Sequence, residues 1–198
     1  MSFDPTYTLL RNFTSPVAAI TTSAGGRRNG FIVNSAQRAS LVPTMPRLSI
    51  YVSKTNFSHD LIYKSGVFAL HLLRTDQFET IFTLGFQSGR EVANKLDLLQ
   101  TVDGTTGCPL LKDCIAGFEC NVVNAMDTGA STFFLGDVVN VLEGKNGPVM
   151  TSEYFRDHLS AEKKWEYENN LRAAAGQLEE LAKNVNRESV WPGPVLAP

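Results

Sequence analysis

The chain has 198 residues, of which 43% are hydrophobic and 19% charged, as in a globular protein large enough to bury a core. Its 18 basic and 20 acidic side chains give a net charge of −2, so no overall basic charge attracts nucleic acid or an anionic membrane surface. No run of about 18 apolar residues is present, and the first residues do not resemble a signal peptide. We therefore expect neither a nucleic-acid nor a membrane partner, and a cytoplasmic location.

The first half of the chain begins with strand-like segments. An apolar, β-branched run at residues 17–22 is followed by a turn-forming segment at 23–30 and a second apolar run at 31–33. Two such runs around glycines predict a β-hairpin. Residues 47–53 alternate apolar with polar side chains, which predicts a half-buried strand.

Helical patterns come next. A short helix is predicted at 58–65, ended by Gly66, and a strand follows at 67–73. Between residues 76 and 99 apolar side chains recur at helical spacing, with a glycine-containing break at 85–89. This pattern predicts two short helices.

The second half repeats the hairpin pattern and then changes composition. Strand-like runs at 117–123 and 132–142 surround a turn and predict a second hairpin. Because most strands follow one another through tight turns, we expect a mainly antiparallel β-barrel with helices packed outside it. We place this domain at residues 1–150 and a C-terminal helical extension at 151–198. Trp165 belongs to the apolar stripe of that extension, and we expect it to face a core.

Residues typical of metal sites or acid–base catalysis form no clear motif. The cysteines are Cys108, Cys114 and Cys120, and this spacing fits neither a disulfide framework nor a zinc site. We interpret them as core thiols. The sequence also contains no paired carboxylates, nucleophile elbow or zinc-protease motif. We therefore assign no metal ligand and no catalytic side chain.

Small and hydroxyl residues gather between Asn29 and Ser40, at the end of the first predicted hairpin. They leave backbone groups open to a flat ligand with hydrogen-bonding edges. A second polar cluster runs from Ser53 to Asp60 and combines hydroxyls, Lys54 and the start of a predicted helix. Unpaired N–H groups and the helix dipole suit a phosphate there. The simpler alternative is an ordinary capped helix start.

The order of these segments resembles the flavin reductase-like family of FMN-binding split barrels. The resemblance extends from about Phe13 to Glu143 and rests on short motifs in a conserved-looking order: Thr21-Thr22, Asn29-Gly30, Ser53-Lys54, His59 with Leu61-Ile62, and Phe134-Leu135-Gly136-Asp137-Val138. It implies a split, Greek-key antiparallel barrel and a homodimer with FMN, or possibly FAD, at the interface. Two positions depart from the family pattern, which commonly has Asn at the place of His71 and Glu at the place of Asp137.

The resemblance also implies which residues contact the cofactor. The segment from Val33 to Ser35 lies along the flavin ring and bonds it largely through the backbone. The positions near the ribityl phosphate are Ser40, Ser53, Lys54, Ser58 and His59. The full set is Val33, Asn34, Ser35, Ala36, Ser40, Ser53, Lys54, Thr55, Ser58 and His59.

The function implied by the resemblance is hydride transfer from NADH or NADPH to flavin N5, with reduced flavin or electrons passed to a partner oxygenase or another acceptor. A non-catalytic FMN-binding electron carrier is the alternative, and a pyridoxamine phosphate oxidase-like or haem-linked split barrel is a third. Several side chains keep two interpretations. Arg27 and Arg28 are solvated hairpin charges or contacts for a nicotinamide cofactor. His59 caps its helix or approaches the phosphate, His71 is an interior histidine or a site residue, and Trp165 could instead stack on a partner's flavin.

Overall fold

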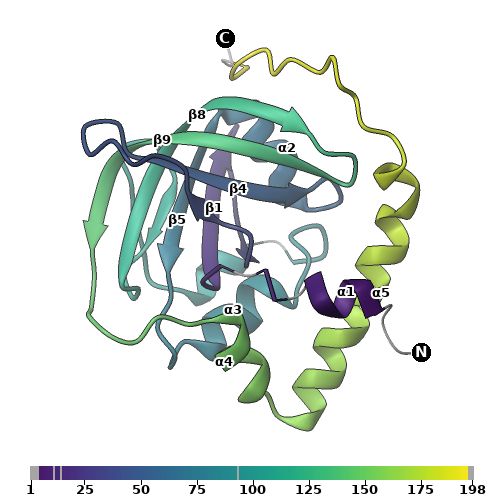
Figure 1. The fold of residues 1–198 in the computed structure, drawn as a ribbon. Helices are drawn as coiled ribbons and strands as arrows, with labels where there is room; N and C mark the ends of the chain where they lie inside the picture. The colour runs from purple at the N-terminus through teal and green to yellow at the C-terminus, as the bar shows by residue number, and fades with distance from the viewer. Residues whose placement is uncertain (1–4, 11, 14, 93, 196–198) are drawn as a thin grey trace.

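The computed structural model describes residues 5–10, 12–13, 15–92 and 94–195, and its centre is a curved antiparallel sheet (Figure 1). Seven strands pair in the order β2-β1-β5-β8-β9-β4-β3 and form a half-barrel. Their bounds are β1 Ala18–Ala24, β2 Arg27–Val33, β3 Gln37–Arg38, β4 Arg47–Ser53, β5 Val67–Leu72, β8 Ala116–Asp127 and β9 Ser131–Glu143. Both predicted hairpins, β1–β2 and β8–β9, are confirmed, as is the antiparallel barrel class.

Helices surround this sheet. They are α1 Pro5–Leu10, α2 Phe57–Ser65, α3 Phe78–Gly85, the 3-10 helix η1 Lys95–Leu98, α4 Ser152–Asp157 and α5 Ala161–Ala182. Helix α2 starts where the side chain of Asn56 accepts a hydrogen bond from Ser58 N, and it ends at Gly66, whose φ of 68° suits glycine. The two helices predicted between residues 76 and 99 are α3 and η1. The pair β6 Thr101–Asp103 and β7 Pro109–Leu111, together with β3 and α1, was not predicted.

The barrel interior and the space beneath α3 form separate cores. Inside the barrel, Ile20, Ile50, Phe68 and Phe134 are fully buried, whereas Tyr51, between two inward residues of β4, is exposed. This alternation is the period-2 pattern expected of a half-buried strand. A second core joins the other face of β1 to α3, and it includes Phe155 of α4. The C-terminal extension is therefore packed on the barrel at its first helix.

Helix α5 packs only lightly on its own chain. None of its described residues is buried, and Trp165 is 70% exposed, so the expectation that Trp165 faces a core is wrong. The reason is that the helix turns a different aromatic side chain toward the barrel: Tyr167 is the ring that meets Phe86 and Phe155. Beyond α5 an extended segment crosses the molecule toward α2 (Figure 1). There Trp191 Nε1 donates to Tyr63 O at 3.0 Å, which anchors the C-terminal segment.

His71 of β5 is fully buried, which confirms the interpretation of this residue as an interior histidine. Its Nδ1 lies 3.2 Å from Ala19 O and its Nε2 accepts from Leu111 N at 3.1 Å. Because Nε2 must be the acceptor, Nδ1 carries the proton and the ring is neutral. Burial lowers the pKa of His71 to about 4, although the Ala19 carbonyl and the charge of Glu119 oppose the shift.

Glu119 of β8 is also fully buried, and it binds a turn. Its carboxylate accepts hydrogen bonds from the backbone N and Oγ1 of both Thr105 and Thr106, and from Asn140 Nδ2 at 2.7 Å. Burial alone would raise the pKa of Glu119, but the bonds from Thr106, Asn140 and Thr105 lower it to about 2. The charged carboxylate therefore organises the turn between β6 and β7.

The cysteines agree with the interpretation as core thiols. Cys108, Cys114 and Cys120 are free and buried. Burial raises the pKa of Cys108 and of Cys114 to about 11, so both thiols are protonated at neutral pH. Within the described part of the chain, no helix is long and apolar enough to cross a membrane.

Candidate functional site

The two predicted binding segments lie on strand edges that face each other. Strand β2 pairs with β1 along its length, and β4 pairs with β9, while β3 covers β4 only at Leu48 and Ser49. Ser35 Oγ donates to Tyr51 O at 3.3 Å, and Asn29 Nδ2 donates to Ser58 Oγ at 2.8 Å. These two bonds place residues 27–35 alongside residues 51–58, and we call the line between them the seam.

The segment predicted to hold the flavin ring lies between two pockets. Val33 and Asn34 line a pocket of about 420 Å³ beneath α5, while Ala36 and Ser40 line a pocket of about 580 Å³. The carbonyl of Asn34 already accepts a hydrogen bond from Ser15 N. The ring segment thus has a pocket at each end, with Val33 and Ala36 buried and Asn34 exposed, and its members do not share one cavity.

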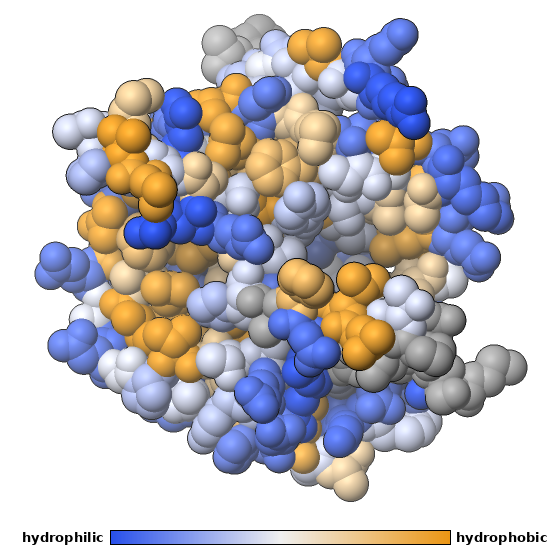
Figure 2. All heavy atoms as spheres, in the orientation of Figure 1, coloured by the Kyte–Doolittle hydropathy of each residue, from blue (hydrophilic) through white to orange (hydrophobic). Residues whose placement is uncertain are grey.

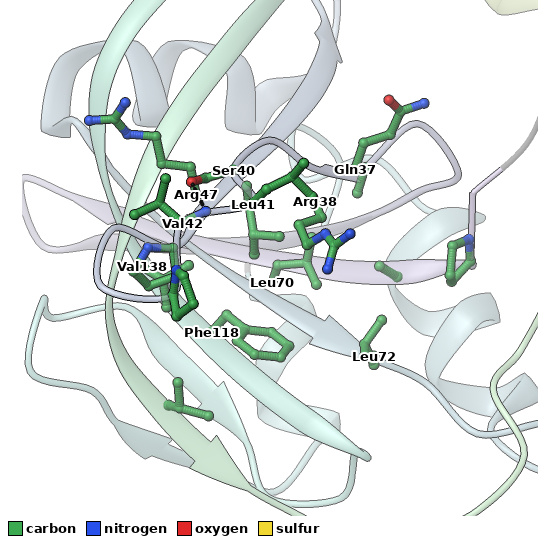
Figure 3. A pocket seen from close by; sticks show the side chains of 17 residues that line it. Gln37, Arg38, Ser40, Leu41, Val42, Arg47, Leu70, Leu72, Phe118 and Val138 are labelled. Atoms are coloured by element: carbon green, nitrogen blue, oxygen red, sulfur yellow. Dashed lines mark hydrogen bonds between the residues drawn. The ribbon is translucent and has the colours of Figure 1, made fainter.

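The larger pocket opens at the end of the barrel next to the loop that joins β3 and β4 (Figure 3). Its walls are almost wholly apolar, and Leu70, Phe118 and Val138 contribute to them from three strands. Two cations stand at its rim. Arg47 Nε donates to Asp137 Oδ1 at 2.6 Å, whereas Arg38 belongs to the short strand β3. The family-like position Asp137 therefore holds an arginine beside this pocket.

The segment predicted to hold the phosphate divides into outward and inward groups. Ser53 Oγ and Thr55 Oγ1 are 2.9 Å apart and partly exposed. Ser58 is fully buried against Asn29, and His59 Nε2 lies 2.8 Å from Thr132 Oγ1. The cap of α2 is Asn56, so the interpretation of His59 as the cap of its helix is wrong. Ser53, Lys54 and Thr55 are partly exposed, whereas Ser58 is buried.

Lys54 is engaged with a residue far away in the sequence. Its Nζ donates to Asp127 Oδ1 at 2.7 Å, and its backbone N donates to Ala130 O at 3.0 Å. The hydrogen bond from Lys54 is the main cause that lowers the pKa of Asp127, with further help from the backbone N–H groups of Gly129 and Asn186. The cation of the predicted phosphate segment is therefore already half of an ion pair.

Two arginines near the start of α2 were not assigned to the phosphate from the sequence. The guanidinium carbon of Arg27 lies 4.6 Å from the centre of the Phe57 ring, and that of Arg90 lies 5.7 Å from it. Gly89 allows this approach, because a Cβ there would lie 2.7 Å from Asn29 and 2.8 Å from Phe57. The stretch Ser88-Gly89-Arg90 was the available signal, but its meaning depends on contact with α2. Together these residues surround the helix start with positive charge.

The chain is similar to several known proteins. Residues 10–162 match the family described as Flavin reductase like domain. A ferric-chelate reductase (NAD(P)H) from Archaeoglobus fulgidus is 29% identical over 134 residues, covering 67% of this chain and 78% of that protein. The FMN reductase (NADH) SmoA from Agrobacterium fabrum is 27% identical over 140 residues, with coverage of 71% and 76%.

Two further similarities concern the extension and the fold. The stachydrine N-demethylase reductase subunit Stc3 from Rhizobium meliloti is 25% identical over 183 residues, covering 91% of this chain and 74% of that protein. The solved NADH:FAD oxidoreductase from Streptomyces globisporus superposes with a TM-score of 0.66 at 24% identity, covering 76% of this chain and 91% of that one. The family match spans well over half of the sequence and includes the whole barrel. This chain belongs to the flavin reductase like domain family.

Proposed function

We propose that this protein binds FMN along the seam and reduces it with NADH or NADPH. The observation that carries the proposal is the seam itself, in which an accessible backbone segment at Val33–Ala36 and a cationic helix start at Phe57 lie along one line. Relatives named as an FMN reductase (NADH) and a ferric-chelate reductase (NAD(P)H) support the reaction. FMN is the expected cofactor, and FAD is the alternative.

The donors of the seam fit a phosphorylated flavin. In this proposal Val33, Asn34, Ser35 and Ala36 lie along the ring, and Ser40 lies near the ribityl phosphate. Ser53, Lys54 and Thr55 take the phosphate together with the N-terminus of α2, and Arg27 and Arg90 add charge. Ser58 and His59 act indirectly, because their bonds to Asn29 and Thr132 hold α2 against the barrel.

The chain's own residues need only bind and orient the two ring systems. Bound flavin supplies the hydride acceptor, so the protein provides position, charge and access. The pockets on either side of residues 33–40 are the spaces available to a nicotinamide ring. Reduced flavin, or electrons, then passes to a separate acceptor, and the relative named as a reductase subunit of a demethylase supports a partner oxygenase.

Flavin binding and NAD(P)H turnover test the function. We expect the purified protein to bind FMN, and we expect NADH or NADPH to be oxidised when FMN is added. Absorbance of the nicotinamide and fluorescence of the flavin report the two steps. Tight FMN binding without NAD(P)H oxidation would instead select the non-catalytic electron carrier. A protein that binds no flavin would contradict both readings.

The proposal includes a homodimer, a domain division and a location. We assign residues 1–150 to the FMN-binding domain and 151–198 to a helical extension that packs on the barrel or the partner subunit. We place the protein in the cytoplasm, which fractionation of the native cells would test. For the dimer we propose the face around the larger pocket, where Leu41 is 83% exposed and Val42, Met45 and Val141 are also exposed. Figure 2 shows apolar groups gathered on the left of the view, near the loop that joins β3 and β4.

The proposed dimer face can be tested by substituting Leu41. Leu41→Asp places a charge in this apolar surface, so we expect the dimer to dissociate and flavin affinity to fall, because a charge buried at an interface is unfavourable. Light scattering after size-exclusion chromatography measures the mass. Leu98→Asp is the matched control, since Leu98 of η1 is 71% exposed but lies outside this face. A Leu41→Asp variant that keeps the mass of a dimer would reject this face.

A further inference from the structure

Asp127 lies where three distant segments of the chain meet. Its Oδ1 accepts from Lys54 Nζ at the end of β4 and from Gly129 N in the β8–β9 turn, both at 2.7 Å. Its Oδ2 accepts from the backbone N of Asn186 at 3.3 Å, just beyond α5. The carboxylate is therefore held on both oxygens by groups that are independent of Lys54.

The C-terminal segment reinforces this position. At Gly129 a Cβ would come within 3.0 Å of Ala182 O, so the end of α5 packs directly on the turn that carries Asp127. Farther along, Val195 N donates to Lys64 O at 2.8 Å and Trp191 packs against the barrel core. The position of Asp127 thus depends on residues 182–195 as well as on its own turn.

The ion pair has a direct consequence for charge. The Lys54 and Asp127 side chains are 24% and 13% exposed, so water only partly screens the electrostatic attraction between them. An anion near Lys54 meets a pair whose net charge is zero. To gain the full attraction of the ammonium, the anion must compete with a carboxylate that the turn and the C-terminal segment keep in place.

We propose that Asp127 is a positioning residue. By holding the Lys54 ammonium in an ion pair, it weakens binding of the flavin phosphate to this site. This inference rests on the proposed function, because it takes Lys54 as part of the phosphate site. Its consequence is that the flavin leaves the protein readily, as a substrate does, and is not held as a permanent group. Removing the negative charge while keeping the shape of the side chain should strengthen binding of phosphorylated flavin alone.

The test compares FMN with riboflavin, which has the same ring but no phosphate. Asp127→Asn keeps an oxygen acceptor for Lys54 and Gly129, and we expect its affinity for FMN to rise about fivefold, the effect of one partly exposed ion pair. Its affinity for riboflavin should stay unchanged. Fluorescence titration at low and high salt measures both, and the gain for FMN should shrink at high salt.

Lys54→Met provides the matched background. In that variant the affinity for FMN should fall toward that for riboflavin, because the ammonium is lost and the Asp127 carboxylate is left unpaired. Adding Asp127→Asn should restore only the part that this unpaired carboxylate removes, so the double variant should bind FMN more weakly than Asp127→Asn alone. An unchanged or weaker affinity of Asp127→Asn for FMN would overturn the inference, as would a parallel change for FMN and riboflavin, which would indicate a loosened turn. If the unmodified protein binds FMN, such a failure leaves the proposed function intact. If it binds neither flavin, the proposed function fails and the inference fails with it.

Discussion

Replacing Glu119 with leucine is expected to lower the free energy of unfolding by about 3 kcal/mol. Thr105, Thr106 and Asn140 donate five hydrogen bonds to this carboxylate, which is fully buried. A leucine side chain accepts none of them, so the donors must find water or remain unpaired. Urea denaturation at neutral pH measures the loss. Glu143→Leu, at the exposed end of β9, is the control and should change stability by no more than about 0.5 kcal/mol.

The stabilising effect of Glu119 also depends on pH. Its pKa is about 2 in the folded protein and 4.5 in its ordinary range, so between these values the unfolded chain binds more protons. Its contribution is therefore complete above pH 4.5 and is lost as the pH falls toward 2. Glu119→Gln, which cannot ionise, should be less stable at neutral pH and should show a weaker dependence in this window. Equal acid sensitivity of both proteins would mean that Glu119 is not the group that titrates.

Lowering the pH from 6.5 to 4 is expected to reduce stability by about 3 kcal/mol through His71 alone. Its pKa falls from 6.5 to about 4 on folding, and each pKa unit corresponds to about 1.4 kcal/mol. Between pH 6.5 and 4, His71 binds a proton in the unfolded chain but remains neutral in the folded protein. A proton on Nε2 would point at Leu111 N–H, which now donates to that atom. Stability is thus greatest above pH 6.5 and falls as the ring is forced to become charged.

His71→Gln separates this effect from other acid-sensitive groups. The amide offers one donor and one acceptor, as the neutral ring does, but it does not titrate. We expect the slope of unfolding free energy against pH between 6.5 and 4 to flatten in the variant, while the slope below pH 4, where Glu119 titrates, remains. His158 lies outside the barrel and is exposed, so His158→Gln serves as the control for replacing a histidine at the surface. A variant with the same slope as the unmodified protein would contradict the assignment to His71.

The longer elements could be predicted because their signals are local. Residues 47–53 alternate so regularly that β4 appears with the predicted bounds, and the glycine after α2 marks the end of that helix. The short strands β3, β6 and β7 carry no comparable period, since two or three residues are too few to show one. They exist because β4 and the turn held by Glu119 supply their partners. The exposure of Trp165 has a similar explanation, because an apolar stripe on a helix does not indicate which surface of the protein it packs against.

The candidate site, too, was predicted only in part from the sequence. The sequence placed hydroxyls, Lys54 and a helix start within a few residues, and these remain together because neighbours in sequence must be neighbours in space. It did not reveal Arg90 beside Phe57 or the pairing of Lys54 with Asp127, 73 residues away. It also did not reveal the bonds that join Ser58 to Asn29 and His59 to Thr132.

By itself, the sequence determined the antiparallel barrel and the two polar segments that we propose bind the flavin, because periodicity and motif order are properties of adjacent residues. The tertiary structure alone decided how these segments face each other across the seam and which carboxylate occupies Lys54. The physical reason is that strand pairing and ion pairing join residues from distant parts of the chain, and their energies depend on burial and distance rather than on sequence spacing.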